Sequence, residues 1–398
     1  MRRSPRPTNG RHPVLAKTAI AILRHERGKY AGVVCGVALA LFLALLQSGF
    51  YLGFRRDITI VADSCDADLW ITPRQLLTLE YCVPFDDAPR WTALSDPEVQ
   101  SAAGLVSEWA RWRRRTDGAT ESAFVVGFDF SAGVPMNLNV FQGAQPASNA
   151  ELAALLAVPG QVLVDEKHLG RAGITELSGF GAELQGKHAR VVGVMHDRKL
   201  FSTACLIVTD LDNGRRYIGL SANRVSYLAV KCCPGADVAV VRQRLAAQLA
   251  DQDVLTAREF HNLTQDYWIR LTGIGPVLLL GAALGALVGF ITVFLTFSHL
   301  TAEKLPVYAA LKAMGASTGE LAGLILSQIA LVFAVGALVA VAGVVAALAV
   351  LAHTTISVSI TSGVWAVGIG SMALCSFAAG VHALRLLAAV EPAEAFKV

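Results

Sequence analysis

Two long apolar runs in the last third of the chain, residues 274–297 and 321–351, constrain the fold more than any other feature. At a rise of ~1.5 Å per residue, a helix over either run is long enough to cross a hydrocarbon layer ~30 Å thick. The aromatic pair Tyr267-Trp268 before the first run suits a membrane interface. The segment between the runs, residues 299–320, reads HLTAEKLPVYAALKAMGASTGE and is polar. The pattern predicts a membrane hairpin whose polar link lies in water.

Two further apolar runs, residues 31–54 and 364–386, bring the number of predicted membrane spans to four. The run at 31–54 contains no charged residue and includes Phe50-Tyr51 near its end, again typical of an interface. A cleaved secretory signal is the alternative for this run, but the apolar core of such a signal is only about 7–15 residues long. We therefore expect an uncleaved span.

Basic residues gather before the first span. Residues 1–30 carry eight Lys or Arg and one acid, Glu26. By the positive-inside rule this segment lies in the cytoplasm of a cell whose inner (plasma) membrane the chain crosses, and four spans return the C-terminal tail to the same side. Apolar residues at helical spacing over 13–27 predict a short amphipathic helix on the membrane surface, with an unstructured basic tail as the alternative.

A long polar region, residues 55–270, separates the first span from the second. The whole chain is 54% hydrophobic and 16% charged, but this region is large enough for a core of its own. Apolar spacing over 237–249 predicts an amphipathic helix. Segments rich in Val, Ile and Phe predict strands at 68–72, 122–128, 161–164, 190–195, 205–209, 226–230 and 254–256. The fold class that follows is a four-helix membrane protein with a mixed α/β extracytoplasmic domain between helices 1 and 2.

No motif in the chain suggests catalysis. The patterns G-x-x-x-x-G-K-[ST] and H-E-x-x-H are both absent, so the chain lacks the P-loop that holds nucleotide phosphates. The net charge of +3 is too small to argue for nucleic acid as a partner. We expect a protein that is not an enzyme and that uses no cofactor or metal.

Three groups of residues in the polar region are candidate sites, each with a structural alternative. Cys65 and Cys82 are a candidate disulfide, although the five cysteines of this region cannot all pair with one another. Asp63, Asp66 and Asp68 form either a cation site or a solvated turn. The third group could hold an acidic substrate or partner, or form a solvated strand edge or turn: Trp109, Arg111, Trp112, Arg113, Arg114 and Arg115.

The polar link at 299–320 is itself a candidate contact surface for another protein. Glu303 and Lys304 open it, and residues 307–314 predict a short helix that Gly315 ends in a left-handed cap. The exposed face of this helix would be mixed apolar and basic, formed by Tyr308, Leu311 and Lys312. From the pattern alone, a docking surface and an inert amphipathic connector are equally open.

Four stretches of the sequence resemble permeases of the MacB/FtsX type, and most closely the DevC-like exporter permeases. They are EKLPVYAALKAMGAS in the link, the terminal EPAEAFKV, DADLWITP after the first span and DYWIRLTGIGP before the second. The order of one span, a large outer domain and three spans also agrees. The resemblance covers essentially the whole chain, and it is weak through residues 80–223.

The resemblance implies the permease subunit of an ATP-driven ABC exporter. Two such chains would form a homodimer in the membrane lipid and bind two copies of a cytoplasmic ABC ATPase, a separate polypeptide. The outer domain would have two lobes. A periplasmic adaptor and an outer-membrane channel would complete an exporter of a lipid, glycolipid or other amphipathic molecule. The alternative is an FtsX-like protein that transmits the same movement to a hydrolase at the outer face without transport.

The resemblance also assigns roles to the cytoplasmic parts. Residues 13–27 match the elbow helix of the family, and residues 301–317 match its coupling segment. The candidate ATPase contacts are therefore Glu303, Lys304, Tyr308, Leu311, Lys312, Met314 and Gly315. The predicted parts of the chain are 1–30 (tail and elbow), 31–54 (first span), 55–270 (outer domain) and 271–398, with spans at about 274–298, 321–351 and 364–386.

Overall fold

The computed structural model of the chain describes residues 27–142, 145–174, 180–202, 204–303, 307, 310, 314, 317–352, 354 and 356–389. The chain divides into two compact units. The helical unit comprises Met1–Leu52, Val277–Val350 and Val358–Val398, and the α/β unit comprises Gly53–Pro276 and Leu351–Ser357.

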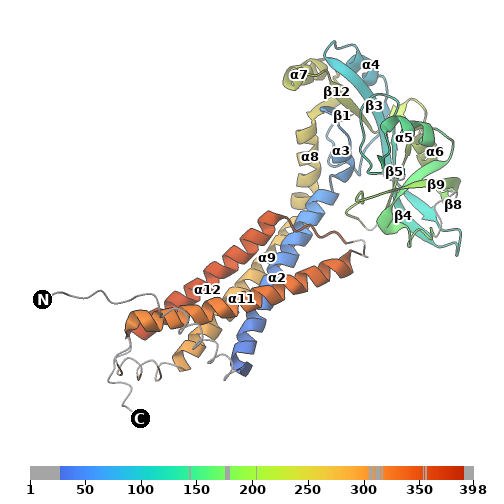
Figure 1. Ribbon diagram of the computed structural model, residues 1–398. Coiled ribbons are helices and arrows are strands. Elements are labelled where there is room, and N and C mark those ends of the chain that lie inside the picture. Colours follow the sequence, from blue (N-terminus) through green and yellow to red (C-terminus); the bar gives the residue numbers. More distant parts are fainter. Residues whose placement is uncertain are drawn as a thin grey trace. The chain divides into compact units, whose positions relative to one another are not determined.

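Four long helices build the helical unit (Figure 1). They are α2 (Arg27–Asp57), α9 (Ile274–Glu303), α11 (Thr318–Leu351) and α12 (Ser362–Ala389). Among the described residues, these four are the helices long and apolar enough to cross a membrane. The predicted four-span architecture is confirmed, and each helix continues past its predicted apolar run at one end or both. The last five residues of α2, 53–57, belong to the α/β unit.

One face of α2 forms the centre of the helical unit. Val33, Val37, Leu41 and Leu45 recur every four residues and are all fully buried, which places them in one row along the helix. They share a cluster with residues of α11 and α12, namely Leu321, Leu324, Ile325, Ile329, Val332, Ala340, Val344, Met372 and Ala379. The helical unit is therefore packed around its first helix.

Small residues let these helices approach closely, as is common between helices in lipid. A Cβ atom added at Gly336 of α11 would lie 2.8 Å from Val37. One added at Gly289 of α9 would lie 2.3 Å from the Cβ of Ala40. Both glycines are therefore required by the distance between the helix backbones.

A nine-stranded sheet, in the order β13-β1-β12-β3-β4-β10-β7-β9-β8, organises the α/β unit. β8 also pairs with β3, so the six strands from β3 to β8 close into a ring. The pairs β4–β10 and β7–β9 are parallel, and the other neighbours are antiparallel. The strands are β1 (Leu69–Pro73), β3 (Val99–Arg113), β4 (Thr120–Phe128), β7 (Gln161–Asp165), β8 (Phe180–Leu184), β9 (Lys187–Met195), β10 (Cys205–Asp210), β12 (Tyr227–Cys232) and β13 (Gln252–Thr256).

Short helices and two small strand pairs complete the α/β unit. The helices are α3 (Ile60–Ser64), α4 (Pro89–Leu94), α5 (Asn149–Leu156), α6 (Leu211–Ile218), α7 (Val238–Gln248), α8 (Ala257–Asp266), the 3₁₀-helix η1 (Glu166–His168) and the π-helix η2 (Tyr267–Leu271). β2 (Phe85–Asp86) pairs with β11 (Arg224–Val225), and β5 (Phe141–Gln142) with β6 (Gln145–Pro146). Thr256 and Glu259 form a capping box that fixes the start of α8.

The long strand β3 joins two parts of the core because its two ends meet different neighbours. Its first half pairs with β12, and its last two residues pair with β8. Ala110 and Trp112 are buried inside the ring with Val125, Val164 and Val191. Nearer the start of β3, Ala103 and Leu105 belong to a second cluster, with Trp70, Phe124 and Phe260. One strand thus ties the ring to the open part of the sheet.

All seven predicted strands are present, and the predicted helix at 237–249 is α7. The expectation of a mixed α/β domain between the first two membrane helices is therefore confirmed. β3 and β8 were not predicted. β3 carries Gly104, Glu108 and three small residues among its apolar positions, and β8 consists of only five residues, so neither has the run of β-branched residues that marked the others. Two lobes within the α/β unit stay a prediction.

Two glycines one turn apart on α9 test the close packing. We expect Gly289→Ala to destabilise the protein by about 1–3 kcal/mol, because the new methyl group has no space beside Ala40. Gly285→Ala is the matched control, since its Cβ would meet Leu43 at an ordinary 3.7 Å; it should be neutral or slightly stabilising. Thermal unfolding in detergent measures both. Equal stability of the two variants would contradict the packing.

Candidate functional site

The structure describes the predicted coupling segment only in part. Glu303 ends α9, where its carboxylate lies 3.4 Å from His299 Nε2. Met314 is an exposed turn residue. The remaining candidate contacts lie outside the described residues, as do residues 13–26 of the predicted elbow helix: Lys304, Tyr308, Leu311, Lys312 and Gly315. Contact with an ATPase therefore stays a prediction for this segment.

Ser317 fixes the point where the link ends and α11 begins. The Ser317 hydroxyl accepts a hydrogen bond from the Glu320 backbone N–H at 3.3 Å, and the Glu320 carboxylate accepts one from the Ser317 N–H at 3.1 Å. This reciprocal cap satisfies two backbone donors that the helix leaves open. The third membrane helix therefore has a defined N-terminus next to the link.

Three segments of the α/β unit lead directly into membrane helices, and we call them together the junction. Residues 53–57 are the end of α2, residues 257–273 contain α8 and η2 before α9, and residues 351–357 connect α11 to α12. Each of these three segments forms hydrogen bonds with other residues of the α/β unit or with another junction segment. The segments of the α/β unit that adjoin the membrane helices are therefore hydrogen-bonded within this unit.

The connection at 351–357 is held at both ends. The Ser357 hydroxyl donates to the carboxylate of Asp57, which is only 5% exposed. A Cβ atom at Gly53 would lie 2.5 Å from the Ser357 carbonyl oxygen, so the two backbones touch there. At the other end, Lys167 Nζ donates to the Ala352 carbonyl. This connection is thus bonded both to the end of α2 and to η1, the 3₁₀-helix that follows β7.

The end of α2 also bonds to α8. Arg55 donates to Gln265 Oε1 at 3.0 Å, and the Gln265 amide donates back to the Arg55 carbonyl at 3.4 Å. One turn along, His261 Nδ1 lies 2.8 Å from Asp63 of α3. These contacts connect the exit of the first membrane helix to the approach to the second.

Trp268 attaches η2 to a buried carboxyl group. Its indole N–H lies 3.0 Å from Glu80 Oε2 and 3.1 Å from Thr78 Oγ1, and its ring packs on Phe201 at a centroid distance of 4.3 Å. Glu80 is only 3% exposed, and burial raises its pKa above the ordinary value. Gly273, with φ +77°, then separates η2 from α9. Trp268 is therefore more than the interfacial anchor that the sequence suggests.

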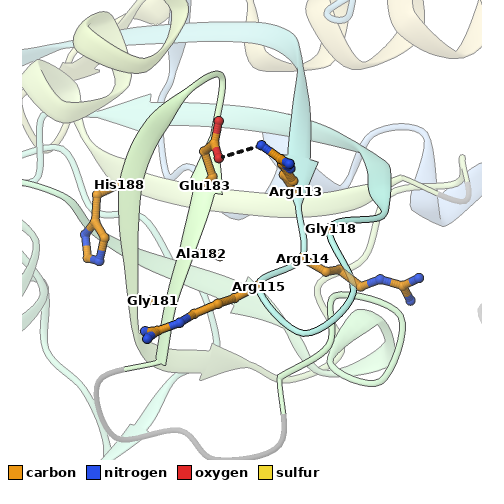
Figure 2. A pocket seen from close by; sticks show the side chains of 8 residues that line it. All are labelled: Arg113, Arg114, Arg115, Gly118, Gly181, Ala182, Glu183 and His188. Carbon is orange, nitrogen blue, oxygen red and sulfur yellow. Dashed lines mark hydrogen bonds and ion pairs between the residues drawn. The ribbon is translucent and has the colours of Figure 1, made fainter.

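The arginine cluster forms a second candidate site on the ring. Between the β3–β4 turn and the β8–β9 hairpin lies a hollow of about 330 Å³. We call it the arginine pocket; it is lined by Arg113, Arg114, Arg115, Gly118, Gly181, Ala182, Glu183 and His188. Figure 2 shows Arg115 reaching from the turn toward Gly181, whereas Arg114 points away.

Strand geometry explains why arginines and tryptophans alternate here. Trp112 is fully buried inside the ring, where its indole N–H donates to the Ala172 carbonyl at 3.1 Å. Arg111 and Arg113 lie on the opposite, exposed face of β3. Trp109 packs edge-on against Phe124. Trp112 is thus a core residue, Trp109 is partly buried against the core, and Arg111 and Arg113 are exposed.

The acidic cluster near the first strand is paired with basic side chains of the same unit. Asp66 and Asp68 lie 2.8 Å and 3.4 Å from Lys231 Nζ, and Asp63 bonds to His261. The described residues contain no group of three or more His, Cys, Asp or Glu side chains placed to hold a metal. The three carboxylates therefore lie beside basic side chains of the same unit.

The candidate disulfide between Cys65 and Cys82 is wrong. Both residues are free thiols. Cys65 is buried opposite Met136 in an isolated bridge, whereas the Cys82 thiol donates to the Ser226 carbonyl at 3.0 Å. The two cysteines have different neighbours in the structure. Their closeness in the sequence therefore did not indicate a disulfide.

Two family models match the chain. One, described as a MacB-like periplasmic core domain, matches residues 31–248, and the other, described as an FtsX-like permease C-terminal domain, matches residues 279–392. No curated protein matches the chain.

Two solved structures are similar to this chain. The periplasmic region of MacB from Actinobacillus actinomycetemcomitans is 14% identical, with a TM-score of 0.36, over 51% of this chain and 92% of that one. The extracellular domain of the noncanonic ABC-type transporter YknZ from Gram-positive bacteria is 11% identical, with a TM-score of 0.33, over 48% of this chain and 99% of that one.

The carboxyl group of Glu80 gives a test of the junction. Its pKa is raised in the folded protein, so the free energy of unfolding falls as the pH rises above 4.5, the ordinary value. Glu80→Gln keeps an acceptor for Trp268 and cannot ionise. We expect it to raise the melting temperature at pH 7.5 by roughly 2–4 °C, the shift that about 1 kcal/mol gives in a unit of this size.

The same comparison at pH 5 supplies the check. There the advantage of Glu80→Gln should shrink, because a larger fraction of wild-type Glu80 is then protonated. Asp251→Asn, at an exposed position, should change nothing at either pH. A variant less stable than wild type at pH 7.5 would mean that ionised Glu80 stabilises the junction.

Proposed function

The chain belongs to the family of MacB-like and FtsX-like permeases, the transmembrane subunits that work with a cytoplasmic ABC ATPase, and we propose that it is the permease subunit of an ATP-driven exporter. In this proposal, two copies of the chain form a dimer and bind two ATPase subunits through residues 301–317. Movement of the membrane helices is relayed to the α/β unit, which acts on a lipid, glycolipid or other amphipathic substrate. A periplasmic adaptor and an outer-membrane channel complete the exporter, as in the DevC-like systems that the sequence resembles.

The junction is the observation that carries the relay. The end of α2, the segment before α9 and the connection between α11 and α12 are each bonded within the α/β unit, by Asp57, Trp268 and Ser357 respectively. All four membrane helices adjoin one of these segments. A displacement of any helix is therefore passed to the unit through hydrogen bonds and packed rings, which supports a force-transmitting permease.

The proposal places both termini and the link in the cytoplasm of an inner-membrane protein, with the α/β unit outside. Eight basic residues before the first span support this orientation. Labelling of Lys312→Cys and Arg111→Cys in intact and opened cells checks it. Reaction of both from the same side would contradict the orientation and the relay together.

A non-transporting regulator is the second candidate, because FtsX-like sequence occupies the C-terminal third. The two functions differ in what the ATPase responds to. An exporter reconstituted with its ATPase should show ATP hydrolysis that rises with its amphipathic substrate. A regulator should instead activate an outer-face hydrolase, and variants that lose activation should lose no transport.

The link gives the first specific prediction. Lys312→Glu reverses the charge and Tyr308→Ala removes the aromatic ring of the proposed contact face, so each should weaken the complex with the ABC ATPase about tenfold or more. Copurification and binding of the ATPase to detergent-solubilised chain measure the effect. Arg258→Glu, at an exposed position of α8, is the control and should bind normally. Unchanged binding by both link variants would show that the ATPase docks elsewhere.

The junction gives the second specific prediction. Ser357→Ala removes the hydroxyl that donates to Asp57, whereas Ser359→Ala, two residues on, removes a hydroxyl for which the structure gives no bond among the described residues. We expect ATP-dependent changes in hydrogen exchange over residues 53–64 and 257–271 of the assembled complex to be reduced at least about twofold in Ser357→Ala, the factor that loss of ~0.5 kcal/mol of coupling gives. Ser359→Ala should match wild type. Identical exchange in all three proteins would remove Ser357 from the relay.

A further inference from the structure

Positive charge exceeds negative charge in the arginine pocket. The Arg113 guanidinium lies 3.4 Å from Glu183, and both side chains are more than two-fifths exposed. Arg114 is held by both oxygens of Asp117, at 2.8 Å and 3.1 Å. Arg115 makes no ion pair with any residue in the described part of the chain. Among the described residues, one guanidinium that lines the hollow is therefore left without a counter-charge.

The register of the sheet brings further basic side chains to the same place. Glu183 stands between Arg113 on β3 and His188 on β9, so the three form a row across three strands. In the next row, Arg190 on β9 lies opposite Gly181 on β8. Paired residues in a sheet project from the same face. A single carboxylate thus lies among several nitrogen-bearing side chains.

Glycine keeps the hollow open. A Cβ atom at Gly181 would lie 2.8 Å from His188 Nε2, so only glycine lets the imidazole lie against this strand. Gly118, with φ +70°, supports the turn that carries Arg115. In Figure 2 the Arg113–Glu183 pair and the Arg115 side chain lie on either side of the hollow. The shape therefore places donors on two sides of one small space.

We propose that the arginine pocket binds a phosphate group, either free or esterified in a small molecule or a lipid headgroup. Guanidinium groups donate forked hydrogen bonds that match phosphate oxygens, and a doubly charged group offsets cations on both sides of the hollow, which one carboxylate does not. At about 330 Å³, the pocket is near the lower limit of ligand sites, so it suits a headgroup and not a polymer. The site does not depend on the proposed export function.

Calorimetric titration of the full chain in a neutral, phosphate-free detergent tests the proposal. The probes are inorganic phosphate, glycerol 3-phosphate and glycerol. We expect both phosphate compounds to bind at low salt, more weakly as salt screens the arginines, and glycerol not to bind. Tighter binding of glycerol 3-phosphate identifies an esterified headgroup as the ligand. Binding of inorganic phosphate at least as tight identifies free phosphate.

Arginine variants locate the binding. Arg115→Gln and Arg113→Gln should each weaken phosphate binding about tenfold, because each removes a charge-assisted donor. Both positions are exposed, so the variants should fold, and an unchanged melting temperature confirms that they do. Arg258→Gln, an exposed arginine on α8, is the matched control and should bind like wild type.

Three results would overturn the proposal. The first is no heat with either phosphate compound. The second is an equal loss in Arg258→Gln and Arg115→Gln, which would mean attraction to general surface charge. The third is saturable binding of an acidic peptide with no binding of phosphate, which would assign the pocket to a protein partner.

Discussion

A helix inside a hydrocarbon layer satisfies its own backbone, so a chain that crosses a membrane changes direction only where an apolar helix ends. This constraint determines where the membrane helices can be attached by side-chain hydrogen bonds. Among the described residues, the hydrogen bonds of Asp57, Trp268 and Ser357 all lie at or beyond such ends. The apolar helices themselves are joined by packing, with Gly289 and Gly336 setting how near their backbones lie.

The helix α2 is packed along its length in the helical unit and hydrogen-bonded at its end in the junction. The row from Val33 to Leu45 is buried along its whole length, so α2 packs as a rod and not as a flexible tether. A rod transmits displacement only if its end is attached. Arg55 and Asp57 provide that attachment, to Gln265 and Ser357 respectively. The packed row lies in the helical unit and the bonded end in the α/β unit, and the single helix α2 contains both.

The local patterns of the sequence predict the helices and strands well, but they predict the contacts between these elements poorly. Apolar runs mark the four membrane helices because lipid demands about 20 apolar residues in a row. Val-rich and Ile-rich segments mark β4, β7, β9 and β10 in the same local way. The closure of β8 on β3 and the bond from Trp268 to Glu80 join residues about 70 and 190 positions apart, and no local pattern contains them. The arginine pocket falls between these cases, because Arg113 and Arg115 stand out in the sequence whereas Gly181 and His188 do not.

The contact that attaches η2 differs chemically from the one that attaches α7. Burial raises the pKa of Glu80 and so favours its neutral form, which accepts from Trp268 without needing a counter-charge. Breaking such a neutral hydrogen bond costs about 0.5–1.5 kcal/mol, whereas separating a buried ion pair costs about 3–5 kcal/mol. Elsewhere in the same unit, two guanidinium nitrogens of Arg244 donate hydrogen bonds to the carboxylate of Asp96. These bonds hold α7 beside the sheet. An ion pair thus holds α7 beside the sheet, whereas at η2 burial favours the neutral form of the carboxyl group that accepts from Trp268.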